Sequence, residues 1–169
     1  DYVSRRQYTV HIKNLKTGEV LQDKIENTTG SITWANDNQT FFYVKKDPQT
    51  LRSFQVYKHI LGTDPAQDEL VFEEKDETFS CFITKTKSQK YLLIGSSQTL
   101  STEYRFLNAN TPDGQWQVVH PREKDLEYSV DHFEDYFYIK TNYKAKNFRL
   151  MKTPVKETTK DHWVEVIPH

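Results

Sequence analysis

A block of four strand-like segments recurs in this sequence about every 48 residues, and this repeat limits the folds that the chain can adopt. Aromatic-rich runs begin at Phe41, Tyr91 and Tyr136, which lie 50 and 45 residues apart. Another strand-like segment precedes each run, at 31–37, 79–84 and 127–132. A fixed period of roughly 20 to 50 residues indicates an architecture built from repeated supersecondary units.

Two further segments complete each block. The third alternates polar and apolar residues and occurs at 9–12, 55–58, 103–106 and 147–150. The fourth occurs at 70–73, 116–119 and 163–166, with 20–25 as a weaker first copy. Short turns rich in Asn, Asp and Gly join the segments, which favours antiparallel neighbours. Four antiparallel strands in each 40 to 50 residues predict the blades of a β-propeller.

The predicted fold class is therefore all-β, a partial β-propeller of about three and a half four-stranded antiparallel blades from a ring expected to have seven. The chain, 1–169, is divided into a half blade at 1–26 and complete blades at 27–76, 77–122 and 123–169. No helix of consequence is needed. A blade is enclosed by its neighbours, so its inner strands should be apolar on both faces and its outer strands should alternate. An aromatic content of 14% agrees with half-buried strands.

Composition argues against several kinds of partner. The net charge is −1, so nucleic acid and anionic membrane surfaces are not expected as partners. The longest apolar runs have four or five residues, far fewer than the roughly 20 that cross a bilayer. Cys81 is the only cysteine, which predicts a cytoplasmic protein with a buried thiol. The chain begins at Asp1 and its only methionine is Met151, so we expect a piece of a longer protein.

Residues for catalysis or metal binding do not group in the sequence. An α/β-hydrolase nucleophile requires a Gly-x-Ser-x-Gly turn, and Gly95-Ser96-Ser97 is followed by no second glycine. Asp131-His132 has no nucleophile beside it, so we interpret the pair as a solvated strand end. The histidines lack the spacing of a zinc site; they are at 11, 59, 120, 132, 162 and 169. We therefore expect no catalytic residue, no metal and no cofactor in this chain.

Two acidic loops repeat with the blades. Glu74-Lys75-Asp76 and Glu123-Lys124-Asp125 are offset by 49 residues, and each precedes the first strand of a predicted blade. Asp76 and Asp125 are expected to hold their turns by accepting backbone hydrogen bonds. The alternative is that these loops face a substrate or a partner domain. The candidate residues for substrate steering or interdomain contact are Asp76, Glu77, Asp125 and Glu127.

Several segments carry a family resemblance. They lie at 4–8, 33–37, 42–44, 67–69, 73–76, 103–107, 127–132 and 146–148, and so span almost the whole chain. They resemble oligopeptidase B, also called protease II, within the prolyl oligopeptidase family of serine peptidases. The resemblance implies a propeller that caps an α/β-hydrolase domain of the same longer chain, in an enzyme that cleaves short peptides after Arg or Lys. The family's catalytic Ser, Asp and His belong to the hydrolase domain, so none is assigned here.

The resemblance leaves this chain the role of a lid and size filter, inactive alone, with short basic peptides as the substrates of the longer enzyme. The acidic loops would then attract those peptides. A free-standing propeller that serves as a protein-interaction scaffold is the alternative, since this fold has many functions. An incomplete ring leaves apolar blade faces bare, which predicts that the isolated chain associates with itself.

Overall fold

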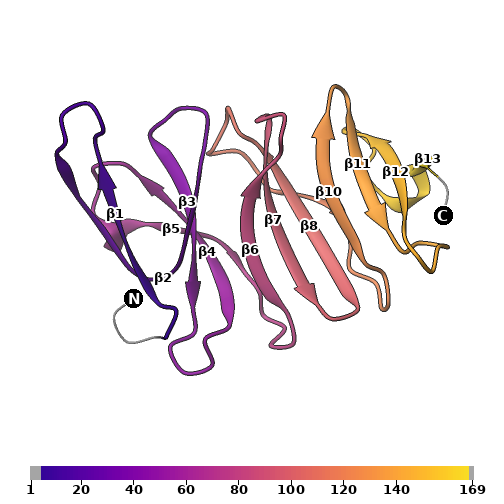
Figure 1. Cartoon of the computed structure of the whole chain (residues 1–169), viewed down its shortest axis with the longest axis horizontal. Coiled ribbons are helices and arrows are strands. Elements are labelled where there is room, and N and C mark those ends of the chain that lie inside the picture. Colours follow the sequence, from indigo (N-terminus) through magenta and orange to yellow (C-terminus); the bar gives the residue numbers. More distant parts are fainter. Residues whose placement is uncertain (1–4, 168–169) are drawn as a thin grey trace. The chain divides into compact units, whose positions relative to one another are not determined.

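The structure is a computed structural model that describes residues 5–167, and Figure 1 shows its strands. The described residues form thirteen strands and two short 3-10 turns, with no α-helix among them. The strands form three antiparallel sheets in chain order, β1–β5, β6–β9 and β10–β13. The all-β prediction is confirmed. Ser4, His169 and the outer ends of the first and last predicted blades lie outside the described residues. None of the described helices is long or apolar enough to cross a membrane.

The chain divides into two compact units, 1–83 and 84–169, and each is described by itself. The first sheet lies in unit 1–83. Its strands are β1 (Tyr8–Lys13), β2 (Val20–Trp34), β3 (Thr40–Lys46), β4 (Ser53–Ile60) and β5 (Glu69–Glu73). The short 3-10 turn η1 (Pro65–Gln67) lies in the β4–β5 connection, where the Asp64 carboxylate accepts a hydrogen bond from the Ala66 amide.

Strand β2 is longer than the repeat predicts. The predicted boundary between 1–26 and 27–76 falls inside it, because β2 pairs with β1 up to Thr28 and then with β3 up to Trp34. Asn27 and Gly30 have φ angles of 59° and 86°, so the backbone bends at the exchange of partners without forming a loop. The structure therefore joins the predicted half blade to the next blade in one five-stranded sheet.

The centre of this sheet is apolar on both faces, as predicted for an inner strand. Phe41, Phe42, Tyr43 and Val44 of β3 are all buried, in a continuous ladder with β4. The Tyr43 ring stacks on Tyr57 with centroids 5.6 Å apart. The half of β2 before Thr28 contributes the buried Ile25 to the core on the face that carries Phe41 and Tyr43.

A buried polar cluster lies beside that core. The His59 imidazole is fully buried, with Nδ1 2.7 Å from Asp68 Oδ1 and Nε2 2.9 Å from Asp23 Oδ1. The Tyr43 hydroxyl donates to Asp68 Oδ2 at 2.8 Å, and the Gly62 amide donates to Asp23 at 2.6 Å. Burial alone would raise the pKa of Asp23, but hydrogen bonds from His59 and Gly62 outweigh it and lower that pKa. The cluster connects β2, β3, β4 and the segment that leads into β5.

The other two sheets are four-stranded. One contains β6 (Ser80–Lys85), β7 (Tyr91–Gln98), β8 (Ser101–Asn108) and β9 (Gln117–His120), and β6 crosses the division between the units. The other contains β10 (Tyr128–Phe133), β11 (Tyr136–Thr141), β12 (Arg149–Pro154) and β13 (Val164–Ile167), with η2 (Lys160–His162) before its last strand. The predicted boundaries at 76/77 and 122/123 fall in the loops that precede β6 and β10.

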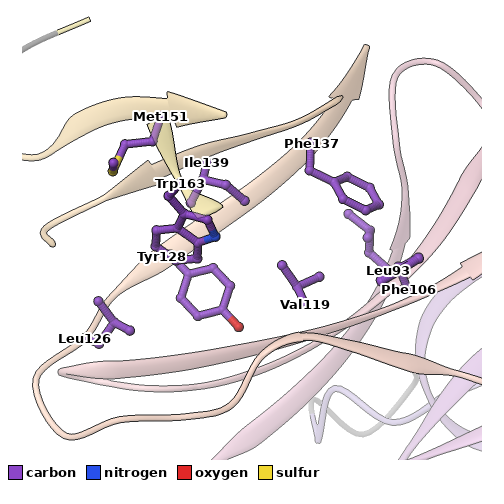
Figure 2. Close-up of a cluster of buried hydrophobic side chains, with 9 residues drawn as sticks. All are labelled: Leu93, Phe106, Val119, Leu126, Tyr128, Phe137, Ile139, Met151 and Trp163. Atoms are coloured by element: carbon purple, nitrogen blue, oxygen red, sulfur yellow. The ribbon is translucent and has the colours of Figure 1, made fainter. Parts of the chain in front are cut away.

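Unit 84–169 has a largely aromatic core, drawn in Figure 2. Leu93, Phe106 and Val119 pack with Phe137, Trp163 and other residues of the last sheet and its approach. The buried Tyr128 ring lies 5.4 Å from the Trp163 ring, and its hydroxyl donates to the His120 carbonyl at 2.5 Å. Burial raises the pKa of Tyr128 well above its ordinary value.

Strand β11 departs from the pattern expected of an inner strand. Phe137 and Ile139 are fully buried in the core of Figure 2, whereas Tyr136 and Tyr138 are only half-buried. Side chains alternate between the faces of a strand, and the core of this unit covers one face of β11. The aromatic run at Tyr136 therefore predicted the strand correctly. The prediction that both faces of this strand are buried was wrong, because the face with Tyr136 and Tyr138 is only half-buried.

The structure shows the surroundings of two sequence features to which no catalytic role was assigned. Cys81 is buried in β6, and burial raises the pKa of its thiol to about 12. Such a cysteine packs as a small hydrophobic residue and is a poor nucleophile. Gly95-Ser96-Ser97 lies within β7, paired along its length with β8. A nucleophile turn needs a sharp strand-to-helix junction, which this ladder does not provide.

Candidate functional site

The first acidic loop connects β5 to β6 and is held by side-chain hydrogen bonds. The Arg52 guanidinium donates to the carbonyls of Glu74, Asp76 and Phe79 at 3.2, 3.3 and 2.9 Å. The Asp76 carboxylate accepts from the backbone amide and the hydroxyl of Thr78, at 2.9 and 2.7 Å. The expectation that Asp76 holds its turn is confirmed. Asp76 and the adjacent Glu77 are both exposed.

The second acidic loop connects β9 to β10. Asp125 is exposed and has a φ of 61°, a backbone conformation that Asp and Asn tolerate better than most residues. Its turn is held through the backbone, because the Asn142 side chain donates to the Asp125 carbonyl at 3.0 Å and accepts from the Glu127 amide at 2.9 Å. Glu127 is half-buried, with its carboxylate 3.5 Å from the Asn142 amide nitrogen.

Glu123, in the same loop, is the centre of a charged network. Its carboxylate lies 2.6 and 2.7 Å from Lys160 Nζ and 2.7 Å from His120 Nε2. The hydrogen bond from Lys160, followed by that from His120, lowers the pKa of Glu123. The Glu123 carboxylate is therefore paired with side chains of the same chain, whereas the exposed carboxylate of Asp125 remains open to solvent.

The predicted site residues thus form two pairs. Asp76 and Glu77 share one loop of unit 1–83, and Asp125 and Glu127 share one loop of unit 84–169. In each pair, the carboxylate of one member, Asp76 or Glu127, is hydrogen-bonded to the chain, and the other member, Glu77 or Asp125, is exposed. Glu77 and Asp125 are the members best placed to act on a charged molecule in solution.

A groove of about 520 Å³ opens at the other end of β10. Its lining comes from the β6–β7 turn, the end of β10 and the adjacent strand β11: Lys87, Ser88, Asp131, His132, Phe133 and Tyr138. Phe133 is 60% exposed, which is unusual for a phenylalanine. A strand rises about 3.3 Å per residue, so this groove lies roughly 20 Å from the acidic loop that precedes β10.

His132 corrects one sequence interpretation. It was expected at a solvated strand end, but it is 3% exposed and lies edge-on to Tyr91 and Phe137 at centroid distances of 4.7 and 5.4 Å. Burial, followed by the charge of Lys90, lowers the pKa of its imidazole. The aromatic neighbours come from β7 and β11, so the adjacent residues in the sequence could not reveal them.

The same histidine has a serine partner that the sequence did not suggest. Ser88 Oγ lies 2.8 Å from His132 Nδ1, although the two residues are 44 positions apart. Ser88 Oγ also lies 2.9 Å from Thr86 Oγ1 and accepts from the Lys90 amide at 3.3 Å. Asp131 Oδ1 accepts from the amides of Lys87 and His132 rather than from the imidazole. These contacts hold the β6–β7 turn against β10, and they do not form a Ser-His-Asp relay.

No group of three or more His, Cys, Asp or Glu side chains within the described residues could hold a metal ion. The two clusters centred on His59 and His120 satisfy their polar atoms through carboxylates, amides and hydroxyls of the chain.

Comparison with known proteins decides the family. The profile of the prolyl oligopeptidase N-terminal β-propeller domain matches residues 1–169. The chain belongs to this family. The three sheets are therefore part of a propeller, and the predicted fold class and family resemblance are both confirmed.

Relatives of this propeller are peptidases. The chain is 41% identical to dipeptidyl aminopeptidase BI of Pseudoxanthomonas mexicana over all of its length, which is 23% of that protein. It is 38% identical to protease 2 of Moraxella lacunata over 89% of its length, or 22% of that protein. Oligopeptidase B from Leishmania major superposes on 98% of the chain with a TM-score of 0.91 and 29% identity, and the match covers 24% of that structure. The propeller chain thus spans about a quarter of the relatives it matches.

Proposed function

We propose that this chain is the non-catalytic propeller portion of a serine endopeptidase similar to oligopeptidase B, which cleaves short peptides after Arg or Lys. The observation that carries the proposal is the match to oligopeptidase B from Leishmania major over 98% of the chain. The relative named protease 2 supports the same activity. Since the chain spans about a quarter of these proteins, the catalytic residues are assigned to a hydrolase domain outside it.

The propeller would act as a lid and size filter. Docking of a rigid domain over a hydrolase face excludes water and limits access to the reacting groups. Strands buried on both faces, such as β3, give the propeller the stiffness that a filter needs. Its partners in this role are the hydrolase domain of the same polypeptide and short basic peptides.

The filter is tested with the full-length protein and peptides of increasing length that share one Arg cleavage site. We expect kcat/KM to fall sharply once a peptide is too large to pass, and an unfolded protein substrate to resist cleavage. Peptides with citrulline in place of Arg provide the control for specificity, because citrulline keeps the shape and lacks the charge. Equal cleavage of short and long substrates would exclude the filter, and equal cleavage of Arg and citrulline peptides would exclude the specificity.

Electrostatic steering by the acidic loops is part of the proposal. Glu77→Gln and Asp125→Asn are the most direct variants, because asparagine tolerates the φ of 61° and neither change removes a carboxylate that holds a turn. We expect the pair to lower kcat/KM for basic peptides about two- to fivefold at low salt, with the loss disappearing at high salt. Glu134→Gln, an exposed site at the groove end of β10, is the matched control. An unchanged salt dependence would rule out steering.

Cleavage of dipeptides from a free amino terminus is the second candidate activity, because the relative that is 41% identical is named a dipeptidyl aminopeptidase. An acetyl group at the substrate's amino terminus distinguishes the two. An endopeptidase should cleave the acetylated and free Arg peptides alike, whereas a dipeptidyl aminopeptidase should lose the acetylated one.

Two further expectations belong to this proposal. A cytoplasmic location is proposed because the single cysteine, Cys81, is buried and makes no disulfide; cell fractionation tests it. Self-association of the isolated chain is proposed because β13 exposes Val164 and Ile167 by 53% and 57%. Sedimentation should show oligomers that dissociate in Ile167→Lys, and a strictly monomeric wild-type chain at high concentration would refute this expectation.

A further inference from the structure

We infer that one end of unit 84–169 carries a binding site for short peptides that end in Arg or Lys with a free carboxylate. Two grooves meet there, of about 470 and 270 Å³, and they share the side chains of Tyr91, Val155 and Lys156. We call them the Asp135 groove and the Asn108 groove. The charged side chains of the first are Lys90, Glu134, Asp135 and Lys156, and the charged and amide side chains of the second are Lys156, Asn108, Gln115 and Gln117.

Tyr91 is the fixed centre of this site. Its ring lies edge-on to His132, Phe137 and Phe106, at centroid distances of 4.7, 5.2 and 5.7 Å, and Figure 2 labels the two phenylalanines. Within the described part of the chain, its hydroxyl has no hydrogen-bond partner. Burial, followed by the charge of Asp135, raises the pKa of this phenol, so it remains a donor at neutral pH. The hydroxyl can therefore donate to a ligand oxygen without first breaking another contact.

The Asn108 groove provides a cation and amide donors for a carboxylate. Lys156 is exposed and makes no ion pair with a described residue. The turn around it is held by a hydrogen bond of 3.0 Å from the Glu157 amide to the Pro154 carbonyl. Asn108 Oδ1 accepts from the Asn110 amide at 2.9 Å, which leaves Nδ2 available as a donor. Since this groove has no carboxylate in its wall, an anionic ligand meets attraction without repulsion there.

The Asp135 groove provides the partner for a basic side chain. Asp135 and Lys156 lie on adjacent turns, because the Val155 amide donates to the Asp135 carbonyl at 3.2 Å. The exposed Asp135 carboxylate is also the one whose charge acts on Tyr91. Negative charge, phenol and positive charge therefore follow one another along the two grooves. A carboxy-terminal Arg or Lys carries the complementary pair, a carboxylate on the main chain and a cation on the side chain.

The site is separate from the residues proposed to steer substrates. Asp135 lies in the turn after β10, whereas the acidic loop with Asp125 precedes β10. The six residues of this strand span roughly 20 Å. The inference rests on the proposed function only for the source of the ligand, because cleavage after Arg or Lys leaves a new carboxylate on that basic residue. The propeller would thus bind the products of the longer enzyme at a second place.

Fluorescence anisotropy of the wild-type 169-residue chain tests the site with three labelled probes. The first is the tetrapeptide Ala-Ala-Ala-Arg with a dye on its amino terminus and a free carboxylate. The second ends in the arginine amide, and the third has citrulline in place of Arg. We expect the free Arg acid to bind, and each of the other two to bind about fivefold more weakly, because each lacks one charge. Equal binding of all three, or no binding of the free acid at millimolar concentration, would overturn the inference.

Exposed variants show which end of the peptide each residue holds. Lys156→Gln should weaken binding of the free Arg acid about fivefold and leave the Arg amide unchanged. Asp135→Asn should weaken the Arg acid and leave the citrulline acid unchanged. Glu134→Gln, an exposed neighbour in the same groove, is the matched control and should keep the wild-type affinity. If the control weakened binding as much as Asp135→Asn, the assignment of Asp135 would be wrong.

The same probes separate this site from the proposed function. The full-length protein, with its serine nucleophile blocked by a fluorophosphonate, should lose part of its binding of the Arg acid in Lys156→Gln. Cleavage of Arg peptides is measured on the unblocked protein. Absence of cleavage with binding intact would refute the proposed activity and leave the site in place. Cleavage with no effect of Lys156→Gln or Asp135→Asn on binding would refute the site alone.

Discussion

The two units of the chain stabilise their interiors with different chemistry. Unit 1–83 buries an ionic cluster around His59, whereas unit 84–169 buries the aromatic cluster around Tyr128 and Trp163 in Figure 2. An apolar core responds mainly to lost volume, and a buried ionic cluster responds to the loss of one partner and to pH. Similar blades of one propeller can therefore unfold under different conditions.

The largest expected effect comes from the aromatic cluster. Trp163 is 6% exposed, contacts the rings of Tyr128 and His120, and donates from Nε1 to the Thr158 carbonyl at 2.8 Å. Trp163→Ala should lower the free energy of unfolding by about 3 to 5 kcal/mol, through lost burial and a cavity. Urea denaturation measures this loss. Trp163→Phe, which keeps an aromatic ring, should cost clearly less; equal losses would show that ring volume is not what matters.

Removal of one ionic partner should have the next largest effect. Asp68→Ala leaves His59 Nδ1 and the Tyr43 hydroxyl without their acceptor in a buried site, which should cost about 3 kcal/mol. Tyr43→Phe removes a single hydrogen bond and should cost about 1 kcal/mol. Chemical denaturation of both variants at pH 6.5 gives the ratio. A cost for Asp68→Ala no larger than that for Tyr43→Phe would show that the cluster adds little to stability.

The buried histidine of unit 84–169 should make stability depend on pH on the acid side. Burial, with the charge of Lys90, lowers the pKa of His132, so its contribution is present above the ordinary value of 6.5 and is lost as pH falls through the lower folded value. His132→Gln should flatten the acid side of the stability curve and leave its alkaline side intact. Thermal unfolding from pH 4.5 to 8 measures both sides. A variant whose curve is parallel to wild type throughout would contradict this role.

The smallest expected effect concerns the first acidic loop. Asp76→Ala removes the acceptor for the Thr78 amide and hydroxyl in an exposed turn, and should cost about 0.5 to 1 kcal/mol. Glu77→Ala, next to it, should change stability by less than about 0.5 kcal/mol. The same denaturation curves compare the two. Equal effects would mean that the Asp76 contacts do not stabilise the turn.

Strand order was predictable because the repeat appears in the residues themselves. Alternation and aromatic runs located fourteen strand-like segments, of which those at 20–25 and 31–37 fall in the single strand β2, and the turn residues indicated antiparallel neighbours. The continuity of β2 was not predictable, because its change of partner depends on the backbone of Asn27 and Gly30 rather than on a loop sequence. Sequence patterns indicate which residues are locally buried. They do not indicate which neighbouring strand a strand pairs with after a bend.

The candidate site was harder to predict than the fold. Both acidic loops were located from the offset of 49 residues, and the role of Asp76 in its turn followed from residue type. The Ser88–His132 contact and the His59 cluster were missed because their members are 9 to 44 positions apart and meet only after the sheets form. Such pairs carry no signal in a single sequence, since either residue alone is an ordinary polar residue in a strand or turn.

The most direct test of the central claim is a peptidase assay of the 169-residue chain alone, with a fluorogenic Arg peptide and the full-length protein measured beside it. We expect cleavage after Arg by the full-length protein and no turnover by the chain, because its Ser88–His132 contact holds a turn and has no carboxylate relay. Turnover by the chain alone that is abolished in Ser88→Ala would contradict the assignment of this propeller as non-catalytic.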